Sequence, residues 1–373
     1  MNKLRIRGDK VKEAIRKRLK ELTSIIGLSG YEWDVARYVK KELEGYADSI
    51  EVMKNGMLVA AKKGKKPGPR VMISAHMDEV GYAVKTISPD GFLYFSKVGL
   101  ASEACLPGRR VLVKGDKGIV PGIIGTRSAH LLTPEEMARP QTVKQSYVDI
   151  CVSSREEAEA LGIRTGSQII PDSPCVEMLN TDYLSGRAID DRVGCAILIE
   201  TMRNLKAEDI HGEIFAVFGI LEESTVSAVS SAVNYLNPDY GLFIDTVPAG
   251  DVPDSDYLKE LPVGLGKGPV IIISQAYAGA MIYAASHPKL VEALRDSASS
   301  AGVKHQEFAF INAAYVTDGA RCIYAGNGMA VVSLAIPRRY SHSPVEVCNL
   351  NDAVAALKIT EDFLKKNIDL TMI

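Results

Sequence analysis

The stretch that decides the fold runs from Val71 to Gly81 and reads VMISAHMDEVG. Its first five residues are mostly apolar, which predicts a buried strand, and the strand ends in His76, Asp78 and Glu79. A buried strand has little use for these groups unless a ligand binds at its carboxyl end, where ligands lie in open α/β sheets. An Asp two residues after a His suits a metal ligand oriented by a second carboxylate, although the polar end of a solvated strand gives the same pattern.

The composition describes a globular chain with room for two domains. The chain has 373 residues, against a prior of about 150 residues per domain. Hydrophobic residues make up 46% and charged residues 24%, the balance of a protein with a substantial core. The formal net charge of -2 gives no reason to expect nucleic acid or a membrane surface as a partner.

Cysteine usage and hydropathy favour a reducing compartment. The six cysteines are scattered and none forms a Cys-x-x-Cys pair, which argues against a disulfide framework and a thiolate zinc site. The basic N-terminal stretch lacks an apolar signal core, and no run approaches the ~20 apolar residues that a membrane span needs. We therefore expect a cytoplasmic protein.

An α/β pattern precedes and follows the strand at 71–75. Apolar residues at helical spacing predict helices over 11–26 and 35–43, and Ser29 with Glu32 predicts a capping box before the second. Asn55-Gly56 predicts a hairpin over 49–61, and the basic segment 62–70 predicts a turn. Beyond residue 184 the pattern predicts helices over 190–205, 288–301 and 351–365 and strands over 212–221, 242–244, 270–274, 307–310 and 329–336.

The middle of the chain has a different texture. Short β-like pieces recur at 91–98, 110–113, 118–126 and 146–152, separated by turns that contain Pro and Gly. This spacing predicts a small β-barrel or sandwich, with short helices over 133–137 and 153–161. The prediction is an α/β domain built from 1–83 and 175–373, with a β-rich domain inserted over 84–174.

Four further sites carry acids or an imidazole at the end of a strand or the start of a helix. They are Asp190-Asp191 before a helix, Glu222-Glu223 and Asp245 after apolar strands, and His342 after the last strand. The carboxyl ends of parallel strands meet at one edge of a sheet, so these groups can converge. Two histidines with several carboxylates suit zinc, cobalt or manganese.

Each of these sites also has an explanation without a metal. Asp190-Asp191 can accept the free amides of the helix that follows. Asp245 can cap a turn, and His342 can be a hydrogen-bonded core histidine. Because five such sites occur in one α/β domain, a metal-binding site is favoured over five separate structural explanations.

These motifs resemble those of the tetrahedral (TET) or glutamyl aminopeptidase family, whose members are two-metal exopeptidases sometimes labelled endoglucanases. The resemblance runs nearly end to end and implies a mixed-sheet zinc-peptidase catalytic domain with an inserted small β-barrel-like domain. The motifs are His76 to Gly81, Gly186 to Gly194, Glu222-Glu223, Asp245 and Tyr340 to Glu346, with Leu106 to Val111, His130 to Glu136, Leu265 to Pro269 and Thr317-Asp318 also similar.

The resemblance implies two divalent metal ions per subunit, zinc first and otherwise cobalt or manganese. The metal ligands would be His76, Asp190, Glu223, Asp245 and His342, with Asp190 bridging the ions. Glu222 would be the general base for a metal-bridging hydroxide, and Asp78 would orient His76. Such an enzyme removes the N-terminal residue from short peptides. Family members often assemble dimers into hollow dodecamers through the inserted domain, and we expect a homo-dodecamer here.

Two departures from the family pattern lie near the expected substrate cleft. After the paired glutamates the family has Val-Gly-Leu-Arg-Gly-Ala, whereas 224–229 reads STVSAV. Around Thr317-Asp318 the family has small residues, whereas this chain has Tyr315, Val316 and Arg321. Arg321 in the cleft would favour acidic side chains, and a surface or interface arginine is an equal alternative.

Three other functions stay open. A glycosidase also uses paired carboxylates, but this function leaves the two histidines unexplained. With one Trp and 6% aromatic residues, the chain also has few aromatic side chains on which a sugar ring could stack. A two-metal deacylase of N-acyl amino acids shares much of the ligand order. The third alternative is a catalytically idle or altered-specificity homologue that retains the shell.

Overall fold

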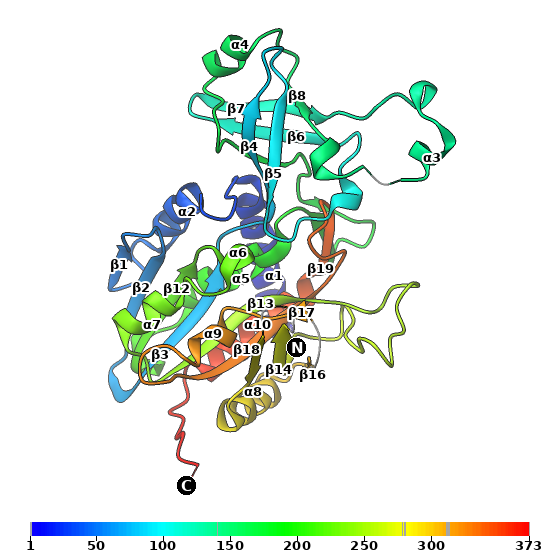
Figure 1. The fold of residues 1–373 in the computed structure, drawn as a ribbon. Coiled ribbons are helices and arrows are strands. Elements are labelled where there is room, and N and C mark those ends of the chain that lie inside the picture. Colours follow the sequence, from blue (N-terminus) through cyan, green and yellow to red (C-terminus); the bar gives the residue numbers. More distant parts are fainter. Residues whose placement is uncertain (1, 140, 278, 280, 311–313, 373) are drawn as a thin grey trace.

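The computed structural model describes residues 2–139, 141–277, 279, 281–310 and 314–372. Within these residues the chain forms a thirteen-stranded mixed sheet packed with helices, and a closed barrel of six antiparallel strands (Figure 1). The α/β class and the barrel-like second part that the sequence predicted are confirmed.

The large sheet has a parallel centre. Its strands are β1 (Ser49–Val52), β2 (Leu58–Lys63), β3 (Lys66–His76), β10 (Val176–Glu177), β11 (Tyr183–Gly186), β12 (His211–Gly219), β13 (Tyr240–Pro248), β14 (Val270–Tyr277), β15 (Ile282–Ala285), β16 (Gln306–Ala309), β17 (Ala314–Tyr315), β18 (Ala330–Arg339) and β19 (Glu346–Asn349). The main path runs β1-β2-β12-β3-β13-β18-β19-β11-β10, and β14 joins it through β18. The pairs β12–β3, β3–β13 and β13–β18 are parallel, so their carboxyl ends lie at one edge.

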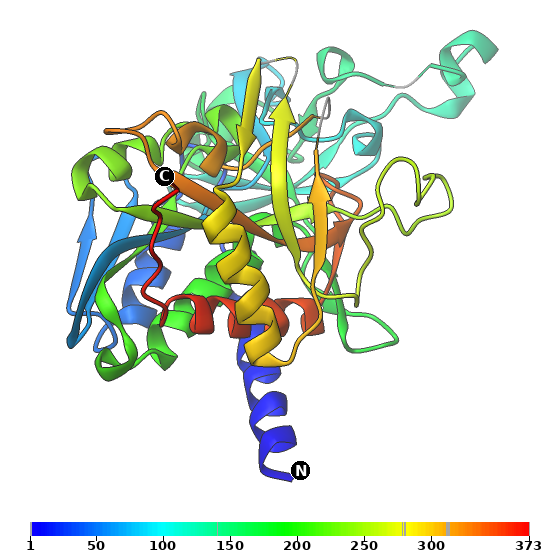
Figure 2. The same cartoon turned by 90° about the horizontal axis from the view of Figure 1, so that it is seen from below.

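The helices cover this sheet. They are α1 (Asn2–Ser24), α2 (Trp33–Leu43), α5 (Ile189–Asn204), α6 (Glu222–Thr225), α7 (Ser230–Leu236), α8 (Pro288–Ala301), α9 (Gly319–Cys322) and α10 (Leu350–Phe363). α5 packs across β3 and β13, with α1 and α10 beside it. Figure 2 shows α8 and α10 in contact, and the first turns of α1 projecting from the body. None of the helices in the described ranges is long and apolar enough to cross a membrane.

The central strands are buried along most of their length. Residues 71–76 of β3, 214–219 of β12 and 240–247 of β13 are all buried. Continuous burial, rather than alternation, is typical of parallel strands with both faces covered. The apolar run that opened the sequence analysis is therefore the middle of the sheet, and its last residue is His76.

Long elements agree with the sequence patterns, whereas several short ones were not predicted. α8 spans the residues predicted for it, because Pro288 starts it and Gly302, at φ 63°, ends it. The hairpin of β1 and β2 is also confirmed. The sequence did not predict α6, α7, α9, β15 or β19, which are too short for periodicity to be recognised.

Two local predictions are wrong. Ser29 and Glu32 form no capping box, because the Glu32 carboxylate accepts the amides of Gly30 and Leu221 instead. The turn predicted over 62–70 is wrong in its bounds: the chain reverses at Gly64 and Lys65 alone, because β2 runs to Lys63 and β3 begins at Lys66. Pairing of Lys66 with His211 of β12 keeps that basic segment extended.

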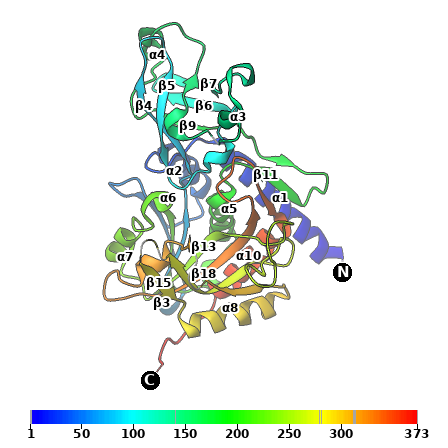
Figure 3. The same ribbon diagram turned by 45° about the vertical axis from the view of Figure 1, so that its right-hand side comes forward.

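The barrel is formed by β4 (Gly81–Ile87), β5 (Leu93–Val98), β6 (Arg110–Gly115), β7 (Gly118–Ile124), β8 (Val148–Asp149) and β9 (Gln168–Pro171), in the closed order β4-β5-β8-β7-β6-β9. It also carries α3 (Pro134–Met137) and α4 (Arg155–Ala160), close to the helices predicted there. It has its own apolar core, to which Tyr82, Phe95 and Ile169 belong. In Figures 1 and 3 the barrel stands above the side of the sheet at which α6 lies. The domain boundaries at 84 and 174 stay a prediction.

Candidate metal centre

The structure brings the seven sequence-predicted site residues together at the carboxyl edge of the parallel strands. His76 is the last residue of β3, and it pairs with Gly219, the last residue of β12. The other residues lie on β13 (Asp245), on α6 (Glu222 and Glu223), at the start of α5 (Asp190), after β3 (Asp78) and after β18 (His342). Their convergence follows from the parallel register.

Asp190 lies between the two imidazoles with one oxygen toward each. His76 Nε2 is 3.2 Å from Asp190 Oδ1, and His342 Nε2 is 3.3 Å from Asp190 Oδ2. His76 Nε2 is also 3.9 Å from Asp245 Oδ1, and His342 Nε2 is 3.3 Å from Glu223 Oε2. Two donors on one tetrahedral ion with bonds of about 2.1 Å lie about 3.4 Å apart. The distances from each imidazole to its carboxylates therefore have the spacing of metal ligands.

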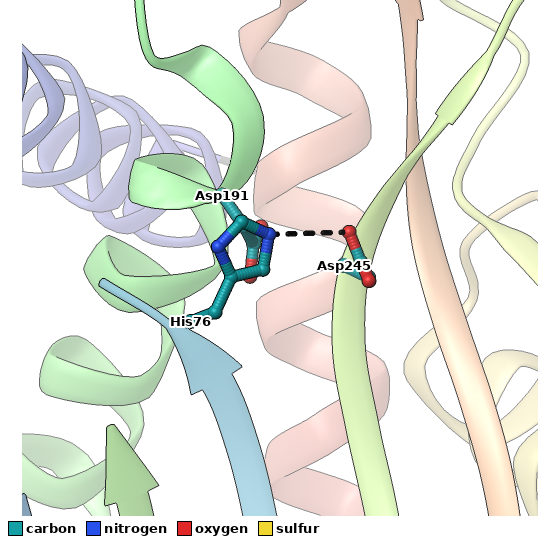
Figure 4. Close-up of side chains that lie close together, drawn as sticks. All are labelled: His76, Asp191 and Asp245. Atoms are coloured by element: carbon teal, nitrogen blue, oxygen red, sulfur yellow. Dashed lines mark ion pairs between the residues drawn. The ribbon is translucent and has the colours of Figure 1, made fainter. Parts of the chain in front are cut away.

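Asp191, the neighbour of Asp190, has a different environment. Its Oδ1 accepts the amide of Gly194 at 3.0 Å, so it satisfies an amide in the first turn of α5. The capping explanation left open for the pair therefore applies to Asp191 and not to Asp190. Asp191 also points toward His76 and Asp245 (Figure 4), with which it forms a group of possible ligands. Its Oδ2 is buried and has no hydrogen-bond partner among the described residues.

Asp78 connects the imidazole to the paired glutamates. Its Oδ1 is 3.3 Å from His76 Nδ1. The same oxygen accepts the amide of Glu222, and Oδ2 accepts the amide of Glu223, both at 3.1 Å. Burial raises the pKa of Asp78, but the interaction with His76 outweighs it and lowers that pKa. One ionised, buried carboxylate thus lies beside the ring and accepts the amides of the turn that carries both glutamates.

The centre contains more carboxyl groups than its basic side chains can neutralise. Burial, with Asp245 and Asp318 nearby, raises the pKa of Glu222 well above its usual range. Burial and Asp190 raise the pKa of Glu223 to about 7, and burial raises the pKa of Asp318 to about 7 as well. Carboxylates crowded in a dry site cannot all ionise without added positive charge. This excess fits a site for divalent cations.

In the two histidines and Asp190, by contrast, the pKa shifts favour the charged form. Burial lowers the pKa of His76, but hydrogen bonds to Asp190 and Asp78 outweigh it and raise that pKa well above its usual range. Burial raises the pKa of Asp190, but Arg338 and the two imidazoles outweigh it and hold that pKa well below its usual range. Asp190 therefore stays ionised, which suits a bridging ligand.

Three further charged residues belong to the site, and the sequence analysis gave them no role. The guanidinium of Arg338 contacts both Asp190 and Glu346. Glu346 accepts the amide of Asp190 at 3.1 Å and the amide of His342 at 3.0 Å. Asp318 is buried, and its Oδ1 has no partner within the described residues. The position of Arg338 at the end of an apolar strand could have indicated a role in the site. Glu346 and Asp318 lie within the family motifs Tyr340 to Glu346 and Thr317-Asp318, but they were given no role there.

A cleft of about 580 Å³ opens beside the centre. Val98 to Leu100 from the barrel side line it, together with Tyr277 and Ile282 from the hairpin of β14 and β15. The residues that depart from the family pattern, Ser224, Thr225, Val226, Tyr315, Val316 and Arg321, line it too. The departures therefore change the wall of the cleft and leave the seven site residues in place.

Comparison with known proteins identifies the family. The profile of the family described as M42 glutamyl aminopeptidase matches residues 56–359. FrvX of Escherichia coli is 32% identical over 93% of this chain and 94% of FrvX. An aminopeptidase from the archaeon Desulfurococcus kamchatkensis superposes with a TM-score of 0.89 at 28% identity, covering 96% of both chains. The TET1 peptidase of Pyrococcus horikoshii, which can assemble into a tetrahedron or a large octahedral shell, superposes with a TM-score of 0.80 at 28% identity, covering 94% of this chain and 99% of that one. The chain belongs to the M42 glutamyl aminopeptidase family and is a peptide hydrolase of the aminopeptidase type.

Proposed function

We propose that this protein is a two-metal aminopeptidase that removes the N-terminal residue from short peptides. The observation that carries the proposal is the position of Asp190, whose two oxygens each face a different imidazole. A carboxylate in this position can bridge two ions about 3.5–4 Å apart. The family supplies the aminopeptidase activity, and the two-ion centre is our inference.

The donor set fits two divalent ions. His76, Asp190 and Asp245 would hold one ion, and His342, Asp190 and Glu223 the other. Nitrogen and oxygen donors without thiolates suit zinc, with cobalt or manganese as alternatives. Bound there, the ions would polarise the scissile carbonyl, acidify a water held between them and attract the free α-amino group of the substrate.

Glu222 is the proposed general base. Its Oε2 lies 3.9 Å from His76 Nε2, and it is not needed as a ligand in either donor set. It would accept a proton from the attacking water as the carbon–oxygen bond forms, and return it to the leaving amine as the peptide carbon–nitrogen bond breaks. Burial holds the pKa of Glu222 above its usual range, which favours a group that both takes up and releases a proton. Asp78 would fix the His76 ring and the amide of Glu222 during this exchange.

A substrate panel tests the function. We expect the purified protein to hydrolyse aminoacyl chromogenic substrates, to lose this activity in a strong chelator and to regain it with zinc or cobalt. N-acyl amino acids in the same panel are expected to stay intact, because they lack the free amine. Turnover of the N-acyl compounds alone would identify a deacylase, and no turnover with metal bound would identify an idle homologue. Activity that survives complete metal removal would exclude the two-ion mechanism.

Arg321 is the proposed specificity residue. It lines the cleft, and its Nε is buried without a hydrogen-bond partner in the described part of the chain. A guanidinium in the wall of the cleft favours a carboxylate on the first side chain of the substrate. We expect Arg321→Met to lower kcat/KM about tenfold for peptides that begin with Glu or Asp, with no change for those that begin with Leu.

The matched control for Arg321 is Arg295→Met. Arg295 is an exposed arginine of α8 whose guanidinium pairs with Glu307 at 2.7 Å, away from the residues that line the cleft. Kinetics on Glu- and Leu-initiated substrates are compared for the wild type and both variants. Equal losses on both substrates in Arg321→Met would mean that Arg321 supports the cleft without reading the side chain.

We also propose that the chain assembles into a homo-dodecamer built from dimers through the inserted barrel. Two observations support this. The TET1 peptidase of Pyrococcus horikoshii can assemble into a tetrahedron or a large octahedral shell, and the barrel side of this chain exposes large apolar residues, with Leu131 at 64% and Met137 at 56%. Sedimentation velocity at micromolar concentration is expected to give one particle of twelve chains. A monomer in that experiment would contradict the assembly and leave the catalytic proposal untouched.

A further inference from the structure

Arg338 is a buried arginine at the centre of the site. It lies near the end of β18 and is 4% exposed. Its Nη2 contacts Asp190 Oδ2, and its Nη1 contacts Glu346 Oε1. It also lines the cleft. A guanidinium therefore touches the carboxylate that we propose to bridge two cations.

The contact with Arg338 makes the two oxygens of Asp190 unequal. Oδ1 faces His76 Nε2 at 3.2 Å, whereas the printed contact of the Arg338 guanidinium is with the other oxygen, Oδ2. Oδ2 faces His342 Nε2 at 3.3 Å and receives Arg338 as well. An ion on the His342 side would have to share its Asp190 oxygen with a charge-assisted hydrogen bond, whereas an ion on the His76 side would not.

The surrounding charges increase this difference. The His76 ring is approached by Asp78 at 3.3 Å and by Glu222 and Asp245 at 3.9 Å. The His342 ring is approached, besides Asp190, by Glu223 at 3.3 Å. Glu346 balances part of the charge of Arg338, but it also accepts the backbone amides of Asp190 and His342. The His76 ring therefore has more carboxylates around it than the His342 ring, and the His76 side chain is 2% exposed against 22% for His342.

Repulsion between the Arg338 guanidinium and a bound ion would weaken ion binding on the His342 side. A guanidinium and a divalent ion bound to the same carboxylate oxygen repel each other at a separation of a few Å, where water screens little. A carboxylate oxygen that already accepts a charge-assisted hydrogen bond also donates less to a metal. Both effects act on the His342 side.

We propose that Arg338 weakens divalent-ion binding on the His342 side, so that the centre fills in order, the His76 side first. This inference rests on the two-ion centre proposed above. The position on the His342 side is then the exchangeable one, and its occupancy follows the concentration of free metal. Arg338 acts through Asp190, so it is a positioning residue.

A simpler role for Arg338 predicts a different outcome. If the arginine only neutralises the buried carboxylates of Asp190 and Glu346, its removal lowers the stability of the metal-free protein and leaves the order of ion binding unchanged. Ion affinity therefore separates the two roles, whereas enzyme activity alone does not.

The experiment measures ion binding to the metal-free protein. Cobalt(II) is titrated into the wild type, Arg338→Met and Arg338→Gln, and binding is followed by calorimetry, by the visible absorption of the bound ion and by metal content after equilibrium dialysis. Arg338→Gln is included because its amide still donates to a neighbouring carboxylate after the charge is lost. Circular dichroism and thermal unfolding check that each variant is folded.

The matched control is Arg339→Met. Arg339 is the next residue, and its guanidinium pairs with Asp251 at 2.8 Å instead of with the site. The Arg339→Met substitution removes one positive charge from β18, as the Arg338 substitutions do. We expect the wild type and Arg339→Met to bind one ion tightly and a second ion about tenfold or more weakly.

In both Arg338 variants the second ion is expected to bind about tenfold tighter or more, with the first affinity unchanged. Equal second-ion affinities in the wild type, Arg338→Met and Arg338→Gln would overturn the inference while leaving the two-ion centre intact. Failure of every protein to bind more than one ion would remove the two-ion centre itself, and this inference with it.

Discussion

The Glu222→Gln variant is expected to keep both ions and to lose turnover by a factor of about 10²–10⁴, the usual contribution of a general base. Glutamine has the size of glutamate and can remain in the same buried position, but it cannot take a proton from water. Because Glu222 is not needed in either donor set, the metal content is expected to stay at that of the wild type. Purified variant and wild type are compared by kcat on an aminoacyl chromogenic substrate and by elemental analysis of bound metal.

The control for Glu222→Gln is Glu213→Gln. Glu213 lies on β12, the strand that precedes the glutamate pair, and its carboxylate is 3.6 Å from Arg70 at the outer part of that strand. This variant is expected to turn over like the wild type. Unimpaired activity in Glu222→Gln would mean that another group, such as the buried carboxyl of Asp318, takes the proton.

Asp190→Asn is expected to have the largest effect of any single substitution in the site. Asparagine offers one oxygen in place of two and carries no charge, so it cannot bridge two ions. We expect at most one ion per chain and a loss of turnover of roughly 10³-fold or more. Metal content and kcat are measured on the same preparation, together with the rise in Tm that added zinc produces. That rise is expected to be smaller than in the wild type, because fewer ions bind the folded state.

Asp191→Asn is the contrast that tests this assignment. Asp191 is the adjacent aspartate, and an amide oxygen can still accept the Gly194 amide that its Oδ1 accepts. Burial and Asp245 also raise the pKa of Asp191 well above its usual range, so less charge is lost on substitution. We expect two ions to remain bound. Loss of an ion in Asp191→Asn with none lost in Asp190→Asn would reverse the roles of the two residues.

The sequence predicted the convergence of the site because the elements involved are long and regular. An apolar strand that ends in His76 must be covered on both faces, and parallel strands place their carboxyl ends at one edge. The same logic brought in Asp245 and the Glu222-Glu223 pair. The roles of these residues came from the family resemblance, since the pattern alone left capping and core explanations open for Asp190 and His342.

Contacts between residues far apart in the chain decided the rest. Ser29 and Glu32 have the spacing of a capping box, but Glu32 accepts the amide of Leu221, 189 residues away, and Ser29 bonds to Ser224. A local motif predicts which hydrogen bonds are available nearby and cannot tell whether a distant donor competes for the same oxygen. The two aspartates at 190 and 191 show the same limit, because adjacent identical side chains acquired different partners.

The sequence by itself determined an α/β sheet with a β-rich segment in its middle, and it placed the acids and imidazoles of 76–79, 190–191, 222–223, 245 and 342 at the edge of that sheet. These features depend on apolar periodicity and strand direction, which are written along the chain. The choice among adjacent acids came from the family resemblance. Only the tertiary structure decided that Asp190 faces both imidazoles, that Arg338 contacts one of its oxygens, and that Glu346 holds the amides of Asp190 and His342. The reason is physical: a buried charge is defined by the partners packed around it, and those partners come from strands and loops that meet only in the fold.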